Sequence, residues 1–363
     1  MHYFFGFSYW KHQFVRPFFP EIDKKEICFI NPFFKKNYFK QAKKKGLDKN
    51  ATVYIWGKKS FPLVEAYAKT HKLKIYRVED GFIRSVGLGS DLTQPYSLVV
   101  DSRGIYFDPT QTSNLEYILQ TYDFDAKLLQ RAKKIQNYLI QEKLSKYNLY
   151  ENIQLDVPKD KKIVLVPGQV EDDASIRYGA NGMTNLKLLK LARQNAEDAY
   201  IIYKPHPDVL VGNRVGDIQE ATALQFADRV VTEVGLESVL AVADAVHTMT
   251  SLVGFEALMR GKDVFTYGMP FYAGWGLTQD MLHSSRRERK LSLVELVAGT
   301  LIIYPRYLNP EKKVLCEIED VLDLLKREKE LYSSAPYKKI KIKLRNYISR
   351  KLQLFLRIIT LKG

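Results

Sequence analysis

The sequence predicts an α/β protein of two Rossmann-like domains followed by C-terminal helices. Short apolar runs alternate with segments whose apolar residues recur every three or four positions. This alternation is typical of parallel sheets with crossover helices. The chain of 363 residues is long enough for two domains with separate cores. When two such domains face each other across a cleft, the architecture is GT-B-like.

The expected elements follow in chain order. Strands are predicted at 27–31, 52–57, 74–79, 97–101, 162–168, 199–205, 230–234, 245–249 and 263–268. Helical patterns cover 61–71, 125–152, 184–196, 236–243, 252–261 and 319–334, and the pattern at 125–152 is expected to lie on the surface. A Pro/Lys turn in VPKDKK precedes a fresh apolar strand. We therefore expect domains at 1–155 and 156–310, a helical segment at 311–336 and a basic tail at 337–363.

The net charge of +15 favours an anionic partner. Much of the excess lies in the tail, which holds nine Lys and Arg and no acid. Its apolar residues have helical spacing, so it is either an amphipathic helix on an anionic membrane surface or a terminal helix packed on the protein. Nucleic acid is disfavoured as a partner, because it would require basic residues across a continuous face.

Targeting and redox signals are weak. No stretch reaches the ~20 apolar residues that span a bilayer, and the N-terminus lacks a signal-peptide pattern. Cys28 and Cys316 lie far apart in the sequence and predict neither a disulfide framework nor a metal site, which fits a reducing cytoplasm.

Four polar loops follow predicted strands, where open α/β sheets bind their ligands. The first contains Glu79, Asp80 and Gly81. Adjacent carboxylates at a strand end suit general acid/base work, because one can hold the other partly protonated. The same residues are also compatible with an ordinary Asp-Gly turn.

The second loop, PGQVEDDASIR, carries Gln169, Asp173 and Arg177 after an apolar strand. Three acids in a row repel each other unless water or a ligand compensates them. Asp173 is a candidate nucleophile, and Gln169 is an amide that would orient it.

The third loop is KPHP. Pro205 and Pro207 fix their own backbone and keep the residues before them extended. His206 therefore lies on stiff chain, as a phosphate ligand would, and Lys204 adds a positive charge.

The fourth loop places Thr248, Thr250 and Ser251 directly before a predicted helix that contains Glu256. Free N–H groups at a helix N-terminus attract anions, although the hydroxyls also suit simple capping. The chain has no P-loop, no GxGxxG after its first strand and no HExxH motif, so neither a P-loop NTPase, nor NAD binding, nor a metal is indicated.

These motifs resemble the KpsC-type capsule polysaccharide β-Kdo transferases. The resemblance covers about residues 50–310 and rests on EDGFIRSVGLGSDL, VLVPGQVEDDAS, YKPHPD, TEVGLESVL and VHTMTSLVGFEALMRGK. KpsC-type enzymes commonly carry two such modules, and this chain has the length of one. Bacterial sialyltransferases are similar in three motifs, which fall here on Glu79-Asp80-Gly81, His206-Pro207 and Thr250-Ser251.

The resemblance implies CMP-Kdo as the donor and retention of configuration without a metal or cofactor. By similarity to a QxxxD motif, Asp173 would be the nucleophile beside Gln169, and Glu79 or Asp80 the acceptor base. Lys204 and His206 would neutralise the leaving phosphate. The donor would also be contacted by Pro207, Thr250, Ser251 and Glu256, and the Kdo carboxylate by Arg84 or Arg177.

The family also implies a lipid-linked saccharide acceptor, the inner face of the cytoplasmic membrane as location, and other capsule or lipopolysaccharide assembly enzymes as partners. An inverting CMP-sugar transferase of the sialyl type, with Asp80 as its base, is the alternative. It shares three motifs but has no use for Gln169 and Asp173.

Overall fold

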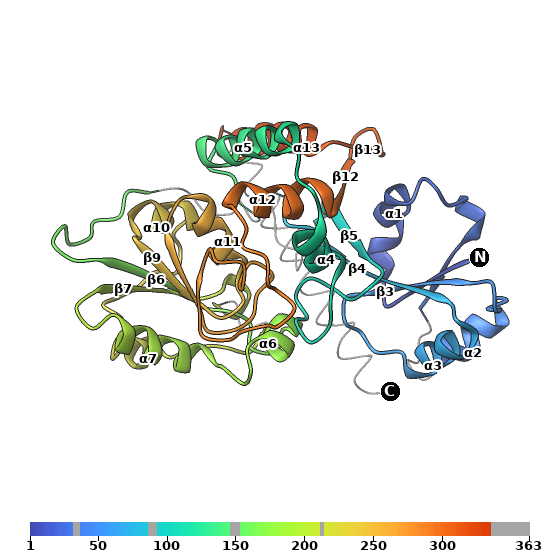
Figure 1. Ribbon diagram of the computed structural model, residues 1–363, viewed down its shortest axis with the longest axis horizontal. Coiled ribbons are helices and arrows are strands. Elements are labelled where there is room, and N and C mark those ends of the chain that lie inside the picture. Colours follow the sequence, from blue (N-terminus) through green and yellow to red (C-terminus); the bar gives the residue numbers. More distant parts are fainter. Residues whose placement is uncertain (32–36, 86–92, 146–152, 211–213, 335–363) are drawn as a thin grey trace. The chain divides into compact units, whose positions relative to one another are not determined.

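The computed structural model describes residues 1–31, 37–85, 93–145, 153–210 and 214–334 (Figure 1). The predicted basic tail lies outside the described residues. The chain forms two compact units. The first unit comprises Met1–Ile105 and the segment that starts at Tyr304, and the second is Tyr106–Ile303.

The first unit contains a mixed sheet of seven strands in the order β13-β12-β5-β4-β3-β1-β2. The strands β1, β2, β3 and β4 are parallel, and β5, β12 and β13 each run antiparallel to a neighbour. Their bounds are His2–Phe5 (β1), Ile27–Ile30 (β2), Thr52–Trp56 (β3), Lys74–Asp80 (β4), Ser97–Asp101 (β5), Pro305–Asn309 (β12) and Val314–Cys316 (β13).

Alternating side chains of β1 supply the two cores of this unit. Phe4 belongs to the cluster that contains Phe14 of α1 (His12–Val15). Tyr3 and Phe5 belong to the opposite cluster, with Ala42 of α2 (Tyr38–Lys44) and buried residues of α3 (Pro62–His71). A strand buried on both faces explains the aromatic run at the N-terminus. The described part of the unit ends with α13 (Ile318–Ser334), which confirms the last predicted helix.

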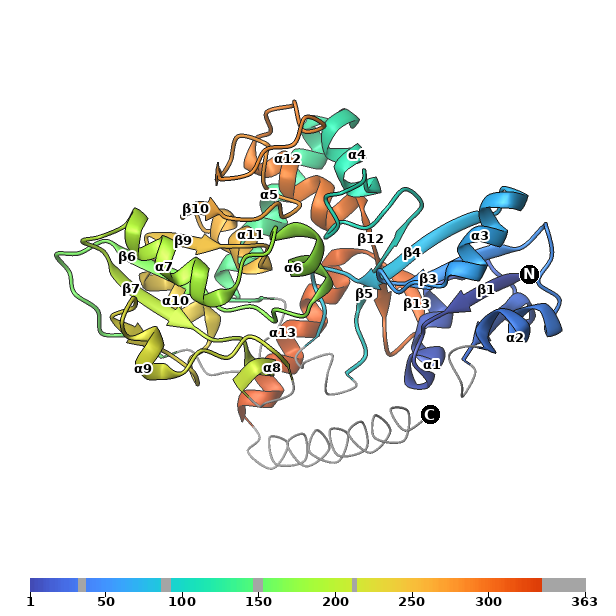
Figure 2. The same ribbon diagram turned by 90° about the horizontal axis from the view of Figure 1, so that it is seen from below.

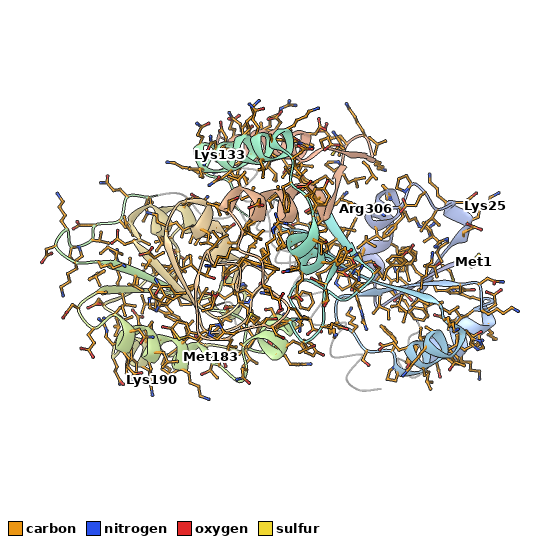
Figure 3. All side chains as sticks on the ribbon, viewed as in Figure 1. Met1, Lys25, Lys133, Met183, Lys190 and Arg306 are labelled. Atoms are coloured by element: carbon orange, nitrogen blue, oxygen red, sulfur yellow. The ribbon has the colours of Figure 1, made fainter. Side chains whose placement is uncertain are left out.

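The second unit contains six parallel strands in the order β11-β10-β9-β6-β7-β8. Their bounds are Ile163–Pro167 (β6), Tyr200–Lys204 (β7), Arg229–Val230 (β8), Ala245–Thr248 (β9), Asp263–Thr266 (β10) and Gln279–Asp280 (β11). The helix α7 (Asn185–Asn195) covers one face, and α10 (Leu236–Val242) and α11 (Leu252–Met259) cover the other (Figure 1). Leu188 and Leu189 of α7 pack on the sheet, whereas Lys190 points away from it (Figure 3).

Further helices complete the second unit: α4 (Asn114–Thr121), α5 (Ala126–Gln141), α6 (Ala174–Gly179), α8 (Pro207–Leu210), α9 (Glu220–Ala223), α12 (Leu293–Val297) and a π-helical segment, Ala298–Ile303 (Figure 2). The helix α5 had been expected on the surface, but it buries one face, including Ile135 and Leu139. A helix with apolar residues on one side buries that side when a partner helix is present, and α5 packs on α12.

Most predicted elements are confirmed, and the differences lie at the edges. The strand expected at 230–234 ends at Val230, and β1, β11, β12 and β13 had not been predicted. The bounds of the two compact units also differ from those of the predicted domains. The boundary at 155/156 falls inside the second unit, because α4 and α5 pack on α12 and the π-helical segment. Residues 305–309 pair with β5 of the first unit.

Candidate functional site

Three of the predicted loops meet at the carboxyl edge of the second sheet. The strands β9, β6 and β7 are neighbours, and the loops that follow them carry Thr250, Gln169 and Lys204 with His206. Parallel pairing places these loops at one edge. The sheet therefore brings together residues that lie up to 82 positions apart in the sequence, from Gln169 to Ser251.

Gln169 joins the loop after β6 to the loop after β9. Its amide Nε2 donates to Thr250 Oγ1 at 3.0 Å, and its Oε1 accepts from the Thr250 N–H at 2.9 Å and from Thr248 Oγ1 at 3.4 Å. The side chain is buried, with 7% of the residue exposed. The amide had been predicted to orient Asp173, but its hydrogen bonds go to the two threonines.

Asp173 is the N-cap of α6. Its Oδ1 accepts from the backbone N–H and the hydroxyl of Ser175, both at 2.9 Å. Its Oδ2 lies 4.0 Å from Arg214 Nη2, and about half of the side chain is exposed. One carboxylate oxygen is therefore fixed by the helix cap, and the other faces a cation and solvent.

The other two acids of this loop have separate partners. Glu171 Oε1 accepts from the backbone N–H of Asn185, at the start of α7, at 2.7 Å. Asp172 Oδ1 accepts from Arg214 Nε at 3.0 Å. The repulsion expected of three consecutive acids is relieved by a helix terminus for Glu171 and by a guanidinium for Asp172.

Lys204 is buried at the end of β7. Its ammonium donates to the carbonyl oxygen of Val234 at 2.6 Å. Burial lowers its pKa from the usual value near 10.5 to about 8. At neutral pH the group is thus still a cation, held in low-dielectric surroundings where its field acts strongly on a nearby anion.

His206 is held by its own turn. Its Nδ1 accepts from the backbone N–H of Asp208 at 3.1 Å. In the neutral ring this bond leaves the proton on Nε2, which makes Nε2 the donor. Gly168 fits against the same segment: a Cβ there would lie 2.8 Å from Tyr203 Oη and 3.1 Å from Pro205 Cα. The stiffness expected of the KPHP segment thus comes with close packing against the loop after β6.

Ser251 caps the N-terminus of α11, and Glu256 lies on that helix. The Ser251 hydroxyl accepts from the Val253 N–H at 3.2 Å, which is the capping role expected of it. Glu256 is 5% exposed and lies in the middle of the helix. Pro207 begins α8, and Arg177 is exposed on α6.

The first unit carries the Glu79–Asp80 pair at the end of β4. Arg84, which is 1% exposed, donates from Nε to Asp80 Oδ2 at 2.8 Å, from Nη1 to Ser85 Oγ and from Nη2 to the carbonyl oxygen of Thr93. Arg84 therefore holds Asp80 and the chain after it. Gly81 is needed here, because a Cβ would lie 2.2 Å from the Ser97 hydroxyl of β5.

Lys11 was missed by the sequence analysis, which considered its segment only as a targeting signal. Its ammonium lies 3.0 Å from the centre of the Trp56 ring and interacts with the charges of Asp80 and Glu79. Burial lowers its pKa to about 8, although the two carboxylates raise it in part. A lysine after β1 and an aromatic residue ending the parallel strand β3 were the signals that could have placed it at this edge.

The comparisons with known proteins agree with these motifs. A family model described as "Capsule polysaccharide biosynthesis protein" matches residues 51–307. This chain belongs to that family. The range holds every residue predicted for the site and all three loops at the edge of the second sheet.

Two curated relatives match most of this chain. The capsule polysaccharide modification protein LipA of Neisseria meningitidis serogroup B is 46% identical over 327 residues, which are 90% of this chain and 45% of LipA. The lipopolysaccharide-processing protein LpsZ of Rhizobium meliloti is 42% identical over 280 residues, which are 76% of this chain and 64% of LpsZ. The chain thus spans less than two thirds of either relative.

Two solved structures of Thermosulfurimonas dismutans KpsC match nearly the whole fold. Its β-Kdo 2,7 transferase is 37% identical with a TM-score of 0.71, over 90% of this chain and 99% of the other. Its β-Kdo 2,4 transferase is 32% identical with a TM-score of 0.74, over 89% and 97%. These matches confirm the KpsC-type resemblance and the GT-B-like α/β fold. Within the described residues, no helix has the length and apolar character needed to cross a membrane.

Proposed function

We propose that this protein is a retaining β-Kdo transferase, which moves Kdo from CMP-Kdo to a saccharide acceptor in capsule or lipopolysaccharide biosynthesis. The likeness to KpsC, whose two structures are β-Kdo transferases, supports the reaction class. The observation that carries the proposal is the Gln169 amide, which ties the loop of Asp173 to the Thr250 loop at the sheet edge that also carries Lys204 and His206.

The leaving CMP phosphate would be stabilised by this edge of the second sheet. Lys204 is a buried cation at neutral pH, since its pKa is about 8. His206 would donate from Nε2, and Thr250 and Ser251 would act with the N-terminus of α11. Glu256 and Pro207 would complete the contacts to the donor. Such fixed donors stabilise charge that develops as the bond breaks, and no metal is required for this role.

The reaction would proceed in two displacements. First, a carboxylate oxygen of Asp173 attacks the anomeric carbon of Kdo, and the bond from that carbon to the CMP phosphate oxygen breaks with its electron pair. Next, the acceptor hydroxyl gives its proton to Glu79 or Asp80 and attacks the same carbon, and the Asp173 ester breaks. Two inversions retain the configuration.

The acceptor would be a lipid-linked saccharide. We propose that the enzyme works on the inner face of the cytoplasmic membrane, with the basic tail at 337–363 on anionic lipid, alongside other assembly enzymes. The proposal rests on the tail's composition and on the capsule family.

Intact-protein mass spectrometry with CMP-Kdo generated in situ tests the mechanism. We expect an adduct of ~220 Da on the wild type, the mass of one bound Kdo ester. Asp173→Asn should abolish it, because the amide keeps the helix cap but is no nucleophile. Asp172→Asn is the matched control, since 48% of that side chain is exposed against 49% for Asp173, and it should still form the adduct.

The alternative is an inverting transferase with Asp80 as base, which the three motifs shared with sialyltransferases favour. NMR of the product separates the two mechanisms. An inverted product, made at the wild-type rate by Asp173→Asn and not by Asp80→Asn, would replace the two-step mechanism by a single displacement.

A further inference from the structure

Arg214 lies beside the candidate nucleophile. Its Nε donates to Asp172 Oδ1 at 3.0 Å, and its Nη2 lies 4.0 Å from Asp173 Oδ2. Its side chain is 30% exposed. The guanidinium therefore lies within ion-pair distance of two of the three acids of the loop, Asp172 and Asp173, and is partly exposed to solvent.

The position of Arg214 is fixed by backbone contacts. The carbonyl oxygen of Val215 accepts from the Glu171 N–H at 2.9 Å, and that of Gly216 accepts from Asn185 Nδ2 at 2.8 Å. Gly216 has a φ of +127°, and a Cβ there would lie 2.7 Å from the carbonyl oxygen of Gln169. The segment that carries Arg214 is thus fastened to the loop that carries Asp173.

The chemistry of the donor creates a need for a cation at this point. In an ulosonic acid such as Kdo, the carboxylate is bonded to the anomeric carbon itself. When Asp173 attacks that carbon, its carboxylate and the sugar carboxylate come within a few ångströms and repel each other. A guanidinium offsets this repulsion best, because its planar fork can bind one carboxylate on each edge.

Arg214 fits this role better than the two arginines considered from the sequence. All three nitrogens of the Arg84 guanidinium donate to neighbouring protein oxygens. Arg177 is exposed, and no ion pair of its guanidinium is found among the described residues. Arg214 uses Nε for Asp172, and within the same residues its Nη1 has no hydrogen-bond partner.

We propose that Arg214 binds the carboxylate of the donor sugar and holds it beside Asp173. The inference rests on the proposed function and deepens it, since it makes Arg214 the residue that selects an acidic sugar. The nucleotide half of the donor is held elsewhere, by the loops after β7 and β9. Removing Arg214 should therefore affect recognition of the sugar and leave recognition of CMP intact.

Steady-state kinetics and calorimetry on the full chain test the assignment. Arg214→Gln should raise KM for CMP-Kdo about 10- to 100-fold, the range expected for loss of a charge-assisted hydrogen bond, and Arg214→Lys should recover part of it. The Kd for CMP, which lacks the carboxylate, should stay within twofold. The matched control is Lys162→Gln, which removes an ion pair with Asp263 (3.2 Å) at the opposite edge of the same sheet. It should leave both constants unchanged.

Other results would overturn either the role of Arg214 alone or the proposed function with it. An unchanged KM in Arg214→Gln, an equal loss of CMP affinity, or the same KM increase in Lys162→Gln would overturn the role of Arg214 while the proposed function stands. A wild-type protein that does not consume CMP-Kdo with any saccharide acceptor supplied would overturn the proposed function, and the role of Arg214 with it.

Discussion

Each unit of the protein places a lysine with a lowered pKa near the carboxyl edge of its sheet, and the two lysines, Lys11 and Lys204, differ in their surroundings. Lys11 of the first unit lies over Trp56 and interacts with Asp80 and Glu79, which raise a pKa that burial lowers. Lys204 of the second unit donates to a backbone carbonyl, and burial accounts for its lowered pKa. Both pKa values are about 8.

The difference assigns the two edges opposite electrostatic roles. In the first unit, Arg84 and Lys11 compensate the adjacent carboxylates of Asp80 and Glu79. In the second unit, a buried cation and hydroxyls are arranged at an edge that suits an incoming anion. The following variants test this contrast, from the largest expected effect to the smallest.

Arg84→Met should lower the free energy of unfolding by about 3–5 kcal/mol, because it leaves the Asp80 carboxylate in the protein without its guanidinium. Chemical denaturation measures this loss. The double variant with Asp80→Asn should recover most of it, since no charge is left to compensate. A loss below 1 kcal/mol would show that Asp80 is well solvated.

Lys204→Met should have the opposite effect on stability and a large effect on activity. We expect kcat/KM for the donor to fall about 100- to 1000-fold, as when a transition-state charge donor is lost. The pKa of Lys204 is lower in the folded than in the unfolded chain, so its charge destabilises the fold fully below pH 8, and this effect disappears as pH rises towards 10.5. After allowance for the lost hydrogen bond, the variant should be more stable by about 1–2 kcal/mol at pH 7.

Denaturation at pH 7 and at pH 10 checks the stability part. The gain should shrink at the higher pH. A variant that is less stable than the wild type at both values would show that Lys204 stabilises the fold, and would remove the contrast between the two edges.

CMP affinity should fall above pH 8, by about tenfold for each pH unit, because phosphate binding needs the protonated amine of Lys204. Calorimetric titration between pH 7 and pH 9.5 measures the slope. Lys204→Arg keeps its charge over this range and should show a flat profile. A steep fall that persists in Lys204→Arg would assign the titration to another group.

Ser251→Ala should destabilise the protein by about 1 kcal/mol through loss of the α11 cap, and should also weaken CMP binding about fivefold. Ser292→Ala is the matched control, because Ser292 caps α12 in the same unit. It should give a similar loss of stability with unchanged CMP affinity. Equal CMP affinities in both variants would reduce Ser251 to a cap.

The sequence predicted the helices and strands well wherever the apolar residues of a segment followed one helix or strand pattern. The strands β6, β7 and β9 and the helices α7 and α11 were placed within one or two residues. The strand β12 was missed because it returns to the first unit from the far end of the chain, and Pro305 obscures its start. Which strands pair across such a distance is decided by packing of the whole unit, which no local pattern contains.

The sequence indicates a candidate site residue where a chemically suitable side chain also lies at the end of a predicted strand. Lys204 ends β7, and His206 and Thr250 lie two residues after the ends of β7 and β9, so the rule for sheet edges predicted that they meet at one edge. Arg214 and Lys11 were missed because only the folded chain brings them to the acids they contact, 42 and 69 positions away in sequence for Asp172 and Asp80. Contacts between residues so far apart produce no regular pattern in the sequence.

The hydrogen bonds of the Gln169 amide also constrain which substitutions the sequence can accept. From the loop after β6, 81 positions earlier, it donates to the Thr250 hydroxyl and accepts from the Thr250 N–H, so replacing Thr250 alone by an apolar residue would leave the buried Gln169 Nε2 without this acceptor. In descendants of this gene the two positions should therefore change together or not at all. An engineer who transplants the Asp173 loop into another scaffold would have to carry Thr250 with it.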